Sequence, residues 1–175
     1  MTKHLRTVVF LAICIALVAL GTMVFRINIP ATNGYMNLGD SVIFAVAIAL
    51  GRRYGLIAGG LGSALADILG GYPAWAPWTL VIKGIEGYIA GALCDDCAEA
   101  GTRSGLFKIV VATLLAGAWM VAGYFIAGAI LYGFSGALGE LPFNLVQAGG
   151  SIVIASVLAP AIRSLRPVLS SSSLS

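Results

Sequence analysis

The chain has 175 residues, of which 59% are hydrophobic and 10% are charged, and its mean hydropathy is +0.99. This composition excludes an ordinary soluble domain and indicates an integral membrane protein embedded in a lipid bilayer. The formal net charge of +3 is small, and the basic residues are spread along the chain instead of forming a patch. Because phosphate backbones are bound by concentrated positive charge, we expect no binding of nucleic acid.

Apolar runs of membrane-spanning length recur along the sequence and predict an all-α integral membrane protein. We expect a compact bundle of six transmembrane helices, forming a single domain over residues 1–166, and a flexible C-terminal tail over residues 167–175. The expected helices cover about 7–25, 41–50, 54–69, 79–93, 107–132 and 142–163. If these helices alternate in direction, eight Lys and Arg residues fall on one side of the membrane, which predicts that both termini are cytoplasmic.

Residues 26–40 interrupt the apolar pattern with Pro30 and an Asn33-Gly34 pair. Asn-Gly is a strong turn signal, so we expect a structured loop that can form a small hairpin. Asp40 comes directly before the next apolar run, where a helix N-cap is wanted. Asp67 ends a row of small residues on the third helix, where an acid serves as a cap or a salt bridge at least as readily as it contacts a ligand. We include Asp67 among the candidate ligand contacts.

The stretch 71–91 places aromatic residues ahead of two charges. Tyr72 and Trp75 belong to an aromatic loop that suits the membrane boundary, whereas Lys83 and Glu86 follow inside an apolar helix. A charged group at such a depth costs about 2.5 to 3.5 kcal/mol on insertion scales, so a compensating role is expected. With a spacing of three residues, Lys83 and Glu86 share a helix face. They can form an ion pair that only joins two helices, or they can line a polar pocket that opens outward.

A glycine-rich loop is expected over residues 133–141, closed by Glu140, with Pro142 opening the sixth helix. Asn144 and Gln147 then lie on one face of the first turns, where their carboxamides can bond across helices or face a ligand. In the alternating arrangement this end, the aromatic loop and residues 26–40 converge on the outer side. We expect a pocket there for a small, flat, polar heteroaromatic molecule, since rings stack on its face while amides and charges bind its edge.

Several enzyme classes are excluded by missing residues. The sequence contains no GxxxxGK[ST] phosphate-binding loop, and its only histidine, His4, lies too near the terminus to activate Ser135. Cys94 and Cys97 form a single CxxC pair, so we expect reduced, incidental thiols rather than a zinc site. We therefore expect no enzymatic activity and no metal or other cofactor, which leaves binding or transport.

Several motifs together resemble one family of membrane proteins. They are the AxxxA pair of Ala12 and Ala16, NLGD before the second helix, GSALADILGGY before a PAWAP loop, and KGxEG in the fourth helix. From residue 8 to about residue 163 the chain resembles the substrate-binding S-components of energy-coupling factor (ECF) vitamin transporters. The likeness is to the branch associated with riboflavin, pyridoxine and hydroxymethylpyrimidine uptake.

The resemblance implies a multi-pass protein of a prokaryotic cell membrane that captures a vitamin on its outer face. A ligand of the hydroxymethylpyrimidine or pyridoxine class is favoured, with riboflavin next. The implied partners are a transmembrane coupling subunit, EcfT, and two cytosolic ATPase subunits, with Ala12 and Ala16 as the docking surface. The residues implied for vitamin binding lie in the first and third outer loops and the outer parts of helices four to six: Asn37, Asp40, Tyr72, Trp75, Lys83, Glu86, Asn144 and Gln147.

Two other functions stay open on the sequence. One is a stand-alone ion-coupled secondary transporter in which Asp67, Lys83 and Glu86 form an ion or proton relay. The other is a structural membrane protein without a ligand, whose polar residues only join helices.

Overall fold

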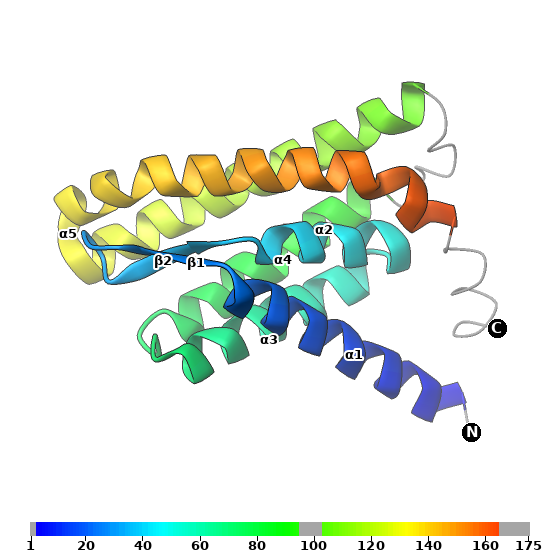
Figure 1. The fold of residues 1–175 in the computed structure, drawn as a ribbon, viewed down its shortest axis with the longest axis horizontal. Coiled ribbons are helices and arrows are strands. Elements are labelled where there is room, and N and C mark those ends of the chain that lie inside the picture. Colours follow the sequence, from blue (N-terminus) through cyan, green and yellow to red (C-terminus); the bar gives the residue numbers. More distant parts are fainter. Residues whose placement is uncertain (1–2, 95–102, 165–175) are drawn as a thin grey trace.

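The computed structural model describes residues 3–94 and 103–164. The acidic residues after Cys94, Cys97 and the expected tail over 167–175 lie outside the described residues. In chain order the elements are α1 (Lys3–Val24), β1 (Arg26–Ile29), β2 (Gly34–Asn37), α2 (Gly39–Leu50), α3 (Arg52–Gly70), α4 (Ala76–Cys94) and α5 (Arg103–Ser164). The helices lie roughly along one direction and confirm the predicted helical fold (Figure 1).

The long element α5 folds back on itself at Gly133, whose backbone (φ 78°, ψ 169°) is not helical. We call residues 103–132 the first arm and residues 134–164 the second arm; the two arms run side by side in opposite directions (Figure 1). The expected loop over 133–141 is therefore wrong, because the helix restarts directly after Gly133. Glu140 and Pro142 lie inside the second arm and do not mark a loop end or a helix start.

The glycines that suggested a loop in this region have a packing role instead. A Cβ built on Gly139 would lie 2.7 Å from the Cβ of Ala31, and one on Gly136 would lie 3.4 Å from the Ala31 carbonyl oxygen. Ala31 belongs to the turn between β1 and β2. Glycine at these two positions lets that turn approach the second arm closely.

The hairpin predicted from Asn33-Gly34 is present. Strands β1 and β2 pair antiparallel, with Arg26 opposite Asn37 and Ile29 opposite Gly34. Asn33 adopts φ 46°, the left-handed backbone that asparagine tolerates in tight turns. The hairpin and the bend of α5 lie at one end of the molecule, whereas the first turn of α1 and the last turn of α5 lie at the other (Figure 1).

Helices α2 and α4 both start earlier than the sequence predicts. Leu38 occupies the N-cap position of α2 and no side chain caps the helix, so the assignment of Asp40 as N-cap is wrong. Asp40 lies in the first turn, is fully buried and turns toward Lys83 on α4. Helix α4 begins at Ala76, three residues before the expected start at residue 79, so Trp78 lies in its first turn.

Helices α3 and α4 approach so closely that their glycines leave no room for side chains. A Cβ on Gly87 would overlap the carbonyl group of Gly55, and a Cβ on Gly59 would lie 2.6 Å from the carbonyl oxygen of Lys83. Small residues permit this contact between backbones. It fixes Lys83, on α4, against α3.

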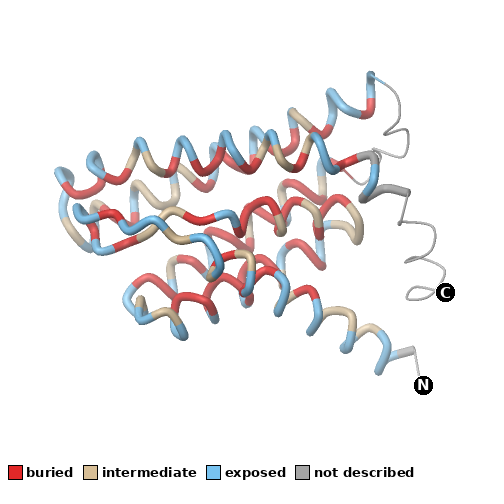
Figure 2. The backbone as a smooth tube through the Cα atoms, viewed as in Figure 1, coloured by how far each residue is buried: buried red, intermediate tan, exposed pale blue. Residues whose placement is uncertain are grey.

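Buried residues recur along α2, α4 and both arms of α5, where they colour the backbone red in Figure 2. One cluster of ten buried residues fills the interior between the first turns of α2 and the terminal end of the molecule. It includes Phe44 and Ile48 of α2, Ala90 of α4 and Ala116 and Ala155 of α5. On α2 and α4 the apolar cluster comes after Asp40 and Lys83 in the chain. The polar groups therefore lie nearer the hairpin end of the bundle.

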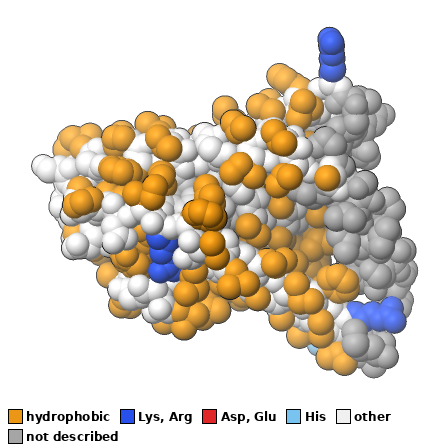
Figure 3. Space-filling model, in the orientation of Figure 1, with side chains coloured by type: hydrophobic (Ala, Val, Ile, Leu, Met, Phe, Trp, Pro, Cys, Tyr) orange, Lys and Arg blue, Asp and Glu red, His pale blue; other side chains and the backbone are white. Residues whose placement is uncertain are grey.

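Large apolar side chains are exposed over much of the surface, including Leu20, Val81 and Val157, which are 57%, 56% and 72% exposed. Figure 3 shows hydrophobic side chains covering most of the visible face, with only isolated Lys and Arg groups. Extended apolar surface of this kind marks contact with lipid or with another protein. By length and composition, two helical stretches could cross a bilayer: His4–Val24 and Arg103–Ala159, which includes both arms of α5. Six crossings and cytoplasmic termini stay predictions.

Candidate ligand-binding site

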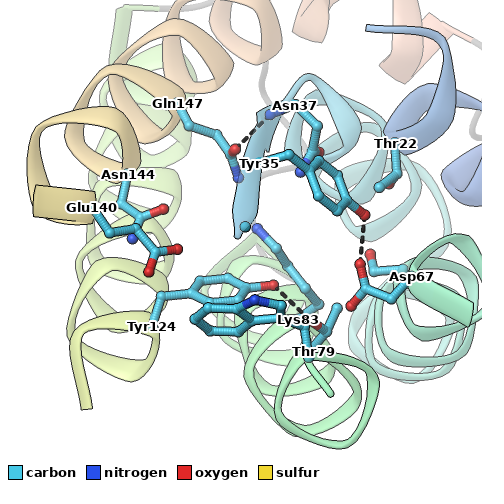
Figure 4. Close-up of a pocket in the computed structure, with 13 residues that line it drawn as sticks. Thr22, Tyr35, Asn37, Asp67, Thr79, Lys83, Tyr124, Glu140, Asn144 and Gln147 are labelled. Carbon is cyan, nitrogen blue, oxygen red and sulfur yellow. Dashed lines mark hydrogen bonds between the residues drawn. The ribbon is translucent and has the colours of Figure 1, made fainter. Parts of the chain in front are cut away.

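A polar cavity lies at the hairpin end of the bundle, enclosed by α3, α4, the hairpin and both arms of α5 (Figure 4). Six of the residues predicted from the sequence line it: Asn37, Asp67, Trp75, Lys83, Asn144 and Gln147. About 390 Å³ within it is not filled by atoms, a figure that includes its open mouth. Most of this space is too narrow for a solute, and the enclosed part has room for roughly one water.

Lys83 is the only cation among the residues that line the cavity, and it is held by two acids. Its Nζ forms an ion pair with Asp40 and lies 3.1 Å from Glu86 Oε2. All three side chains are at most 1% exposed. Asp40 and Glu86 do not line the cavity, so they position and neutralise Lys83. The ion pair predicted at the three-residue spacing, Lys83–Glu86, is therefore present within α4. The Asp40–Lys83 pair joins α2 to α4, and Lys83 also lines the cavity.

Gln147 connects this cluster to the hairpin. Its Nε2 donates a 2.9 Å hydrogen bond to Asp40 Oδ2, and its Oε1 accepts a 2.7 Å hydrogen bond from the backbone N–H of Asn37. Asn37 Oδ1 in turn accepts a hydrogen bond from the backbone N–H of Gly39 at 2.8 Å. A single buried network thus ties α4, α2, the second arm of α5 and β2 together.

Asp67 of α3 holds the hairpin from the opposite side. The Tyr35 hydroxyl donates a 2.5 Å hydrogen bond to Asp67 Oδ1, as Figure 4 shows. Burial is the main cause that raises the pKa of the Tyr35 phenol, and the nearby Asp67 carboxylate raises it further. The Tyr35 hydroxyl therefore keeps its proton and stays a hydrogen-bond donor. The Arg26 guanidinium lies 4.6 Å from the centre of the Tyr35 ring and donates a 2.9 Å hydrogen bond to the Ala66 carbonyl oxygen. Tyr72 lies outside the cavity, with its ring 4.6 Å from that of Tyr35.

An aromatic group forms another wall of the cavity. Trp75 is 4% exposed; its ring stacks on Tyr132 at 5.7 Å and tilts against Tyr124 at 5.8 Å. The Tyr124 hydroxyl donates a 3.1 Å hydrogen bond to Thr79 Oγ1. The Lys83 ammonium lies 5.3 Å from the centre of the Tyr124 ring, within the range of a cation–π interaction. This wall provides flat apolar faces beside charged groups.

Five polar atoms of the lining are buried and have no hydrogen-bond partner among the described residues. They are Ser63 Oγ, Asp67 Oδ2, Trp75 Nε1, Glu140 Oε2 and Asn144 Nδ2. Buried polar groups are nearly always paired, because each unpaired one costs about 1 to 3 kcal/mol. Five such atoms around one cavity therefore indicate a place for polar molecules.

The cavity also contains residues that the sequence did not single out: Thr22, Ser63, Thr79 and Glu140. Glu140 was assigned to a loop end, although its spacing of four residues from Asn144 is a detectable helical signal. The three hydroxyl residues carry no distinguishing pattern. Tyr35 and Tyr124 also line the cavity.

Ala12 and Ala16 lie far along α1 from the cavity and are both exposed. The opposite side of α1 carries the buried residues Cys14 and Val18, which pack in a cluster with Ile43 of α2. Among the described residues, no group of three or more His, Cys, Asp or Glu side chains is placed to hold a metal ion.

Comparison with known proteins gives consistent similarities. A family model described as "ECF-type riboflavin transporter, S component" matches residues 2–164. An "uncharacterized protein in gap 3′ region" of Pyrococcus woesei is 45% identical over 137 residues, covering 78% of this chain and 88% of that protein. The thiamine precursor transporter HmpT of Lactococcus lactis subsp. cremoris is 32% identical over 161 residues, covering 91% and 89%. The crystal structure of the S-component for biotin from an ECF-type ABC transporter shares the fold, with TM-score 0.57, 19% identity and 95% of each chain covered.

Proposed function

Because this chain belongs to the family of S components of ECF-type riboflavin transporters, we propose that it binds a small heteroaromatic vitamin or precursor and delivers it to an ATPase-driven module. The favoured ligand is of the hydroxymethylpyrimidine or pyridoxine class, with riboflavin next. The family consists of transporter components and not of enzymes. The transmembrane coupling subunit EcfT and two cytosolic ATPase subunits are the proposed partners.

One observation carries the proposal: the five unpaired polar atoms that face one buried cavity beside Trp75 and Tyr124. Aromatic faces and scattered donors and acceptors are what a flat polar ring needs, since its faces stack and its edge forms hydrogen bonds. The relative HmpT is named as a transporter of a thiamine precursor, which supports the pyrimidine class.

Ligand size limits the choice further. Room for about one water is too little for any heteroaromatic ring, so the walls must move outward on binding. The hairpin is one such wall, and the Tyr35–Asp67 and Asn37–Gln147 hydrogen bonds are among the contacts that hold it. A small displacement of the hairpin accommodates one ring more readily than the three fused rings of a flavin.

We propose a multi-pass arrangement in the cell membrane, with the hairpin end outside and both termini in the cytoplasm. The exposed apolar side chains of α1 and α5 then face lipid. Ala12 and Ala16 form an exposed small-residue stripe on α1, which suits close approach by a helix of EcfT.

Ligand binding is tested by purifying the protein from cells, identifying any co-purifying small molecule by mass spectrometry, and measuring affinities by isothermal titration calorimetry. We expect a pyrimidine or pyridine compound to bind, with uptake in cells only when the ATPase subunits are present. Uptake that needs no ATPase subunit and collapses with a protonophore would instead identify an ion-coupled carrier. Failure of every vitamin to bind would refute the proposal and favour a structural role.

Docking is tested by replacing Ala12 and Ala16 with tryptophan. Both side chains are exposed, so binding should be retained while uptake falls to the background level. Leu17→Trp, at a position of α1 that is 49% exposed, is the control for size and should retain uptake. Normal uptake by the double variant would remove this stripe from the docking surface.

A further inference from the structure

One carboxylate of the cavity has no cation to balance it. The charge of Lys83 is taken up by Asp40 and Glu86, and Asp67 accepts a hydrogen bond from Tyr35. For Glu140, no Lys, Arg or His among the described residues lies within ion-pair distance. Glu140 is only 3% exposed, and its Oε2 has no hydrogen-bond partner. A buried carboxyl oxygen without a partner is stabilised by a ligand that brings an N–H donor.

Two unpaired donors lie beside Glu140. Asn144 is one helical turn further along the second arm, is 3% exposed and lies next to the Glu140 side chain at the cavity (Figure 4), and its Nδ2 has no hydrogen-bond partner among the described residues. Trp75 is 4% exposed and its Nε1 is also unpaired. The Trp75 ring and the Glu140 carboxyl meet at Gly34, where an added Cβ would lie 3.6 Å from Trp75 Cε2 and 3.4 Å from Glu140 Oε1. Asn144 and Trp75 are therefore two donors in the neighbourhood of the Glu140 carboxyl.

We propose that Glu140, with Asn144 and Trp75, is the specificity-determining group of this cavity, and that it recognises a heteroaromatic edge in which an N–H donor is flanked by two acceptors. The inference rests on the proposed function, since it specifies the ligand of the same cavity. Glu140 Oε2 accepts the ligand N–H, while Asn144 Nδ2 and Trp75 Nε1 donate to the flanking acceptors. Each unpaired atom of the three residues gains its missing partner.

An edge with an N–H donor between two acceptors occurs on some vitamin-like rings and not on others. In 4-amino-5-hydroxymethyl-2-methylpyrimidine the amino group lies between a ring nitrogen and a hydroxymethyl oxygen, which fits. The imide edge of a flavin, an N–H between two carbonyl oxygens, offers the same pattern on a larger molecule. Pyridoxine has a phenolic hydroxyl with an acceptor on one side only. The 4-oxo analogue places a carbonyl oxygen where the amino group would meet Glu140, and its own ring N–H has an acceptor on one side only, so it binds more weakly.

The test measures the affinity of the purified full chain for the aminopyrimidine, its 4-oxo analogue, riboflavin and pyridoxine by titration calorimetry. We expect the wild type to prefer the amino compound over the oxo compound by at least about 100-fold, because a site built around buried polar groups rejects a ligand that leaves them unpaired. Glu140→Gln offers an amide N–H to the oxo group, so it should reduce this ratio at least about 10-fold. Leu138→Ala, on the same helix at a position 47% exposed, should leave the ratio unchanged.

A second variant keeps the test decisive if Glu140→Gln does not fold. Asn144→Asp exchanges the donor for an acceptor of the same shape, so the affinity for the aminopyrimidine should fall at least about 10-fold. Tighter binding of riboflavin than of the aminopyrimidine would mean that Glu140 recognises the imide edge of a flavin, which has the same pattern of donor and acceptors.

The results separate the two proposals. A wild-type protein that binds the aminopyrimidine, but with an amino-to-oxo ratio that Glu140→Gln leaves unchanged, overturns the role of Glu140 and leaves the proposed function standing. Exclusive binding of pyridoxine also overturns the role of Glu140 and leaves the proposed function standing. If the wild type binds no vitamin, the proposed function fails, and the specificity assignment fails with it.

Discussion

Replacement of Lys83 by methionine tests how the buried charges hold the bundle together. The substitution keeps the length of the side chain but leaves Asp40 and Glu86 facing each other with no cation, and both are fully buried. Asp40 keeps one hydrogen bond, from Gln147, whereas neither oxygen of Glu86 has a hydrogen-bond partner among the described residues. Breaking a buried ion pair by removing one partner costs about 3 to 5 kcal/mol.

The cost is measurable by thermal unfolding in detergent, followed by tryptophan fluorescence. For a chain of this length 1 kcal/mol corresponds to about 2 to 4 °C, so Lys83→Met should lower the midpoint by roughly 6 to 20 °C. The control Lys108→Met also removes one positive charge, but at an exposed position of α5, so it should change the unfolding midpoint little. The triple variant that adds Asp40→Asn and Glu86→Gln removes all the charges and should recover much of the loss.

Two results would refute this reasoning. Equal midpoints for Lys83→Met and Lys108→Met would mean that the cluster does not stabilise the contact between α2 and α4. A triple variant that is less stable than Lys83→Met would mean that the two acids have favourable contacts of their own, independent of the lysine.

Two further predictions concern the hairpin and the helix crossing. Tyr35→Phe leaves the 2%-exposed Asp67 without its donor, so stability should fall by about 1 to 3 kcal/mol; hydrogen exchange of the hairpin amides should quicken, and unchanged exchange would contradict the role of this bond. Gly87→Leu forces a side chain into the Gly55 backbone and should prevent folding, seen as loss of a monodisperse peak in size-exclusion chromatography. The control Gly149→Ala, where an added Cβ meets nothing within 4 Å, should elute like the wild type; a well-folded Gly87→Leu protein would show that the helices can separate.

The sequence predicted local features better than distant contacts. The hairpin followed from Asn33-Gly34, because turn chemistry depends on neighbouring residues alone. The short second helix followed from its apolar run, and its end at Leu50 was correct. Asp40 was misassigned as a cap because its true partners, Lys83 and Gln147, are 43 and 107 residues away in the sequence.

Glu140 was missed for a related reason. Glycines every three residues from Gly133 suggested a loop, and only Gly133 has the positive φ of a turn. Gly136 and Gly139 are helical and make space for the hairpin turn at Ala31. A packing requirement between segments a hundred residues apart cannot be distinguished from a turn signal in the sequence alone. Because Glu140 was assigned to a loop, its position on the same helix face as Asn144 was not predicted.

The apolar cluster around Phe44 closes the inner end of the polar cavity, so the cavity can open only toward the hairpin. Ten tightly buried side chains separate Lys83 from the terminal end of the bundle, so a solute that enters past the hairpin can leave only the way it came. Net movement across a bilayer then requires the helices to part or the whole molecule to reorient. Liposomes that contain this protein alone should consequently bind solute yet remain sealed against its passage.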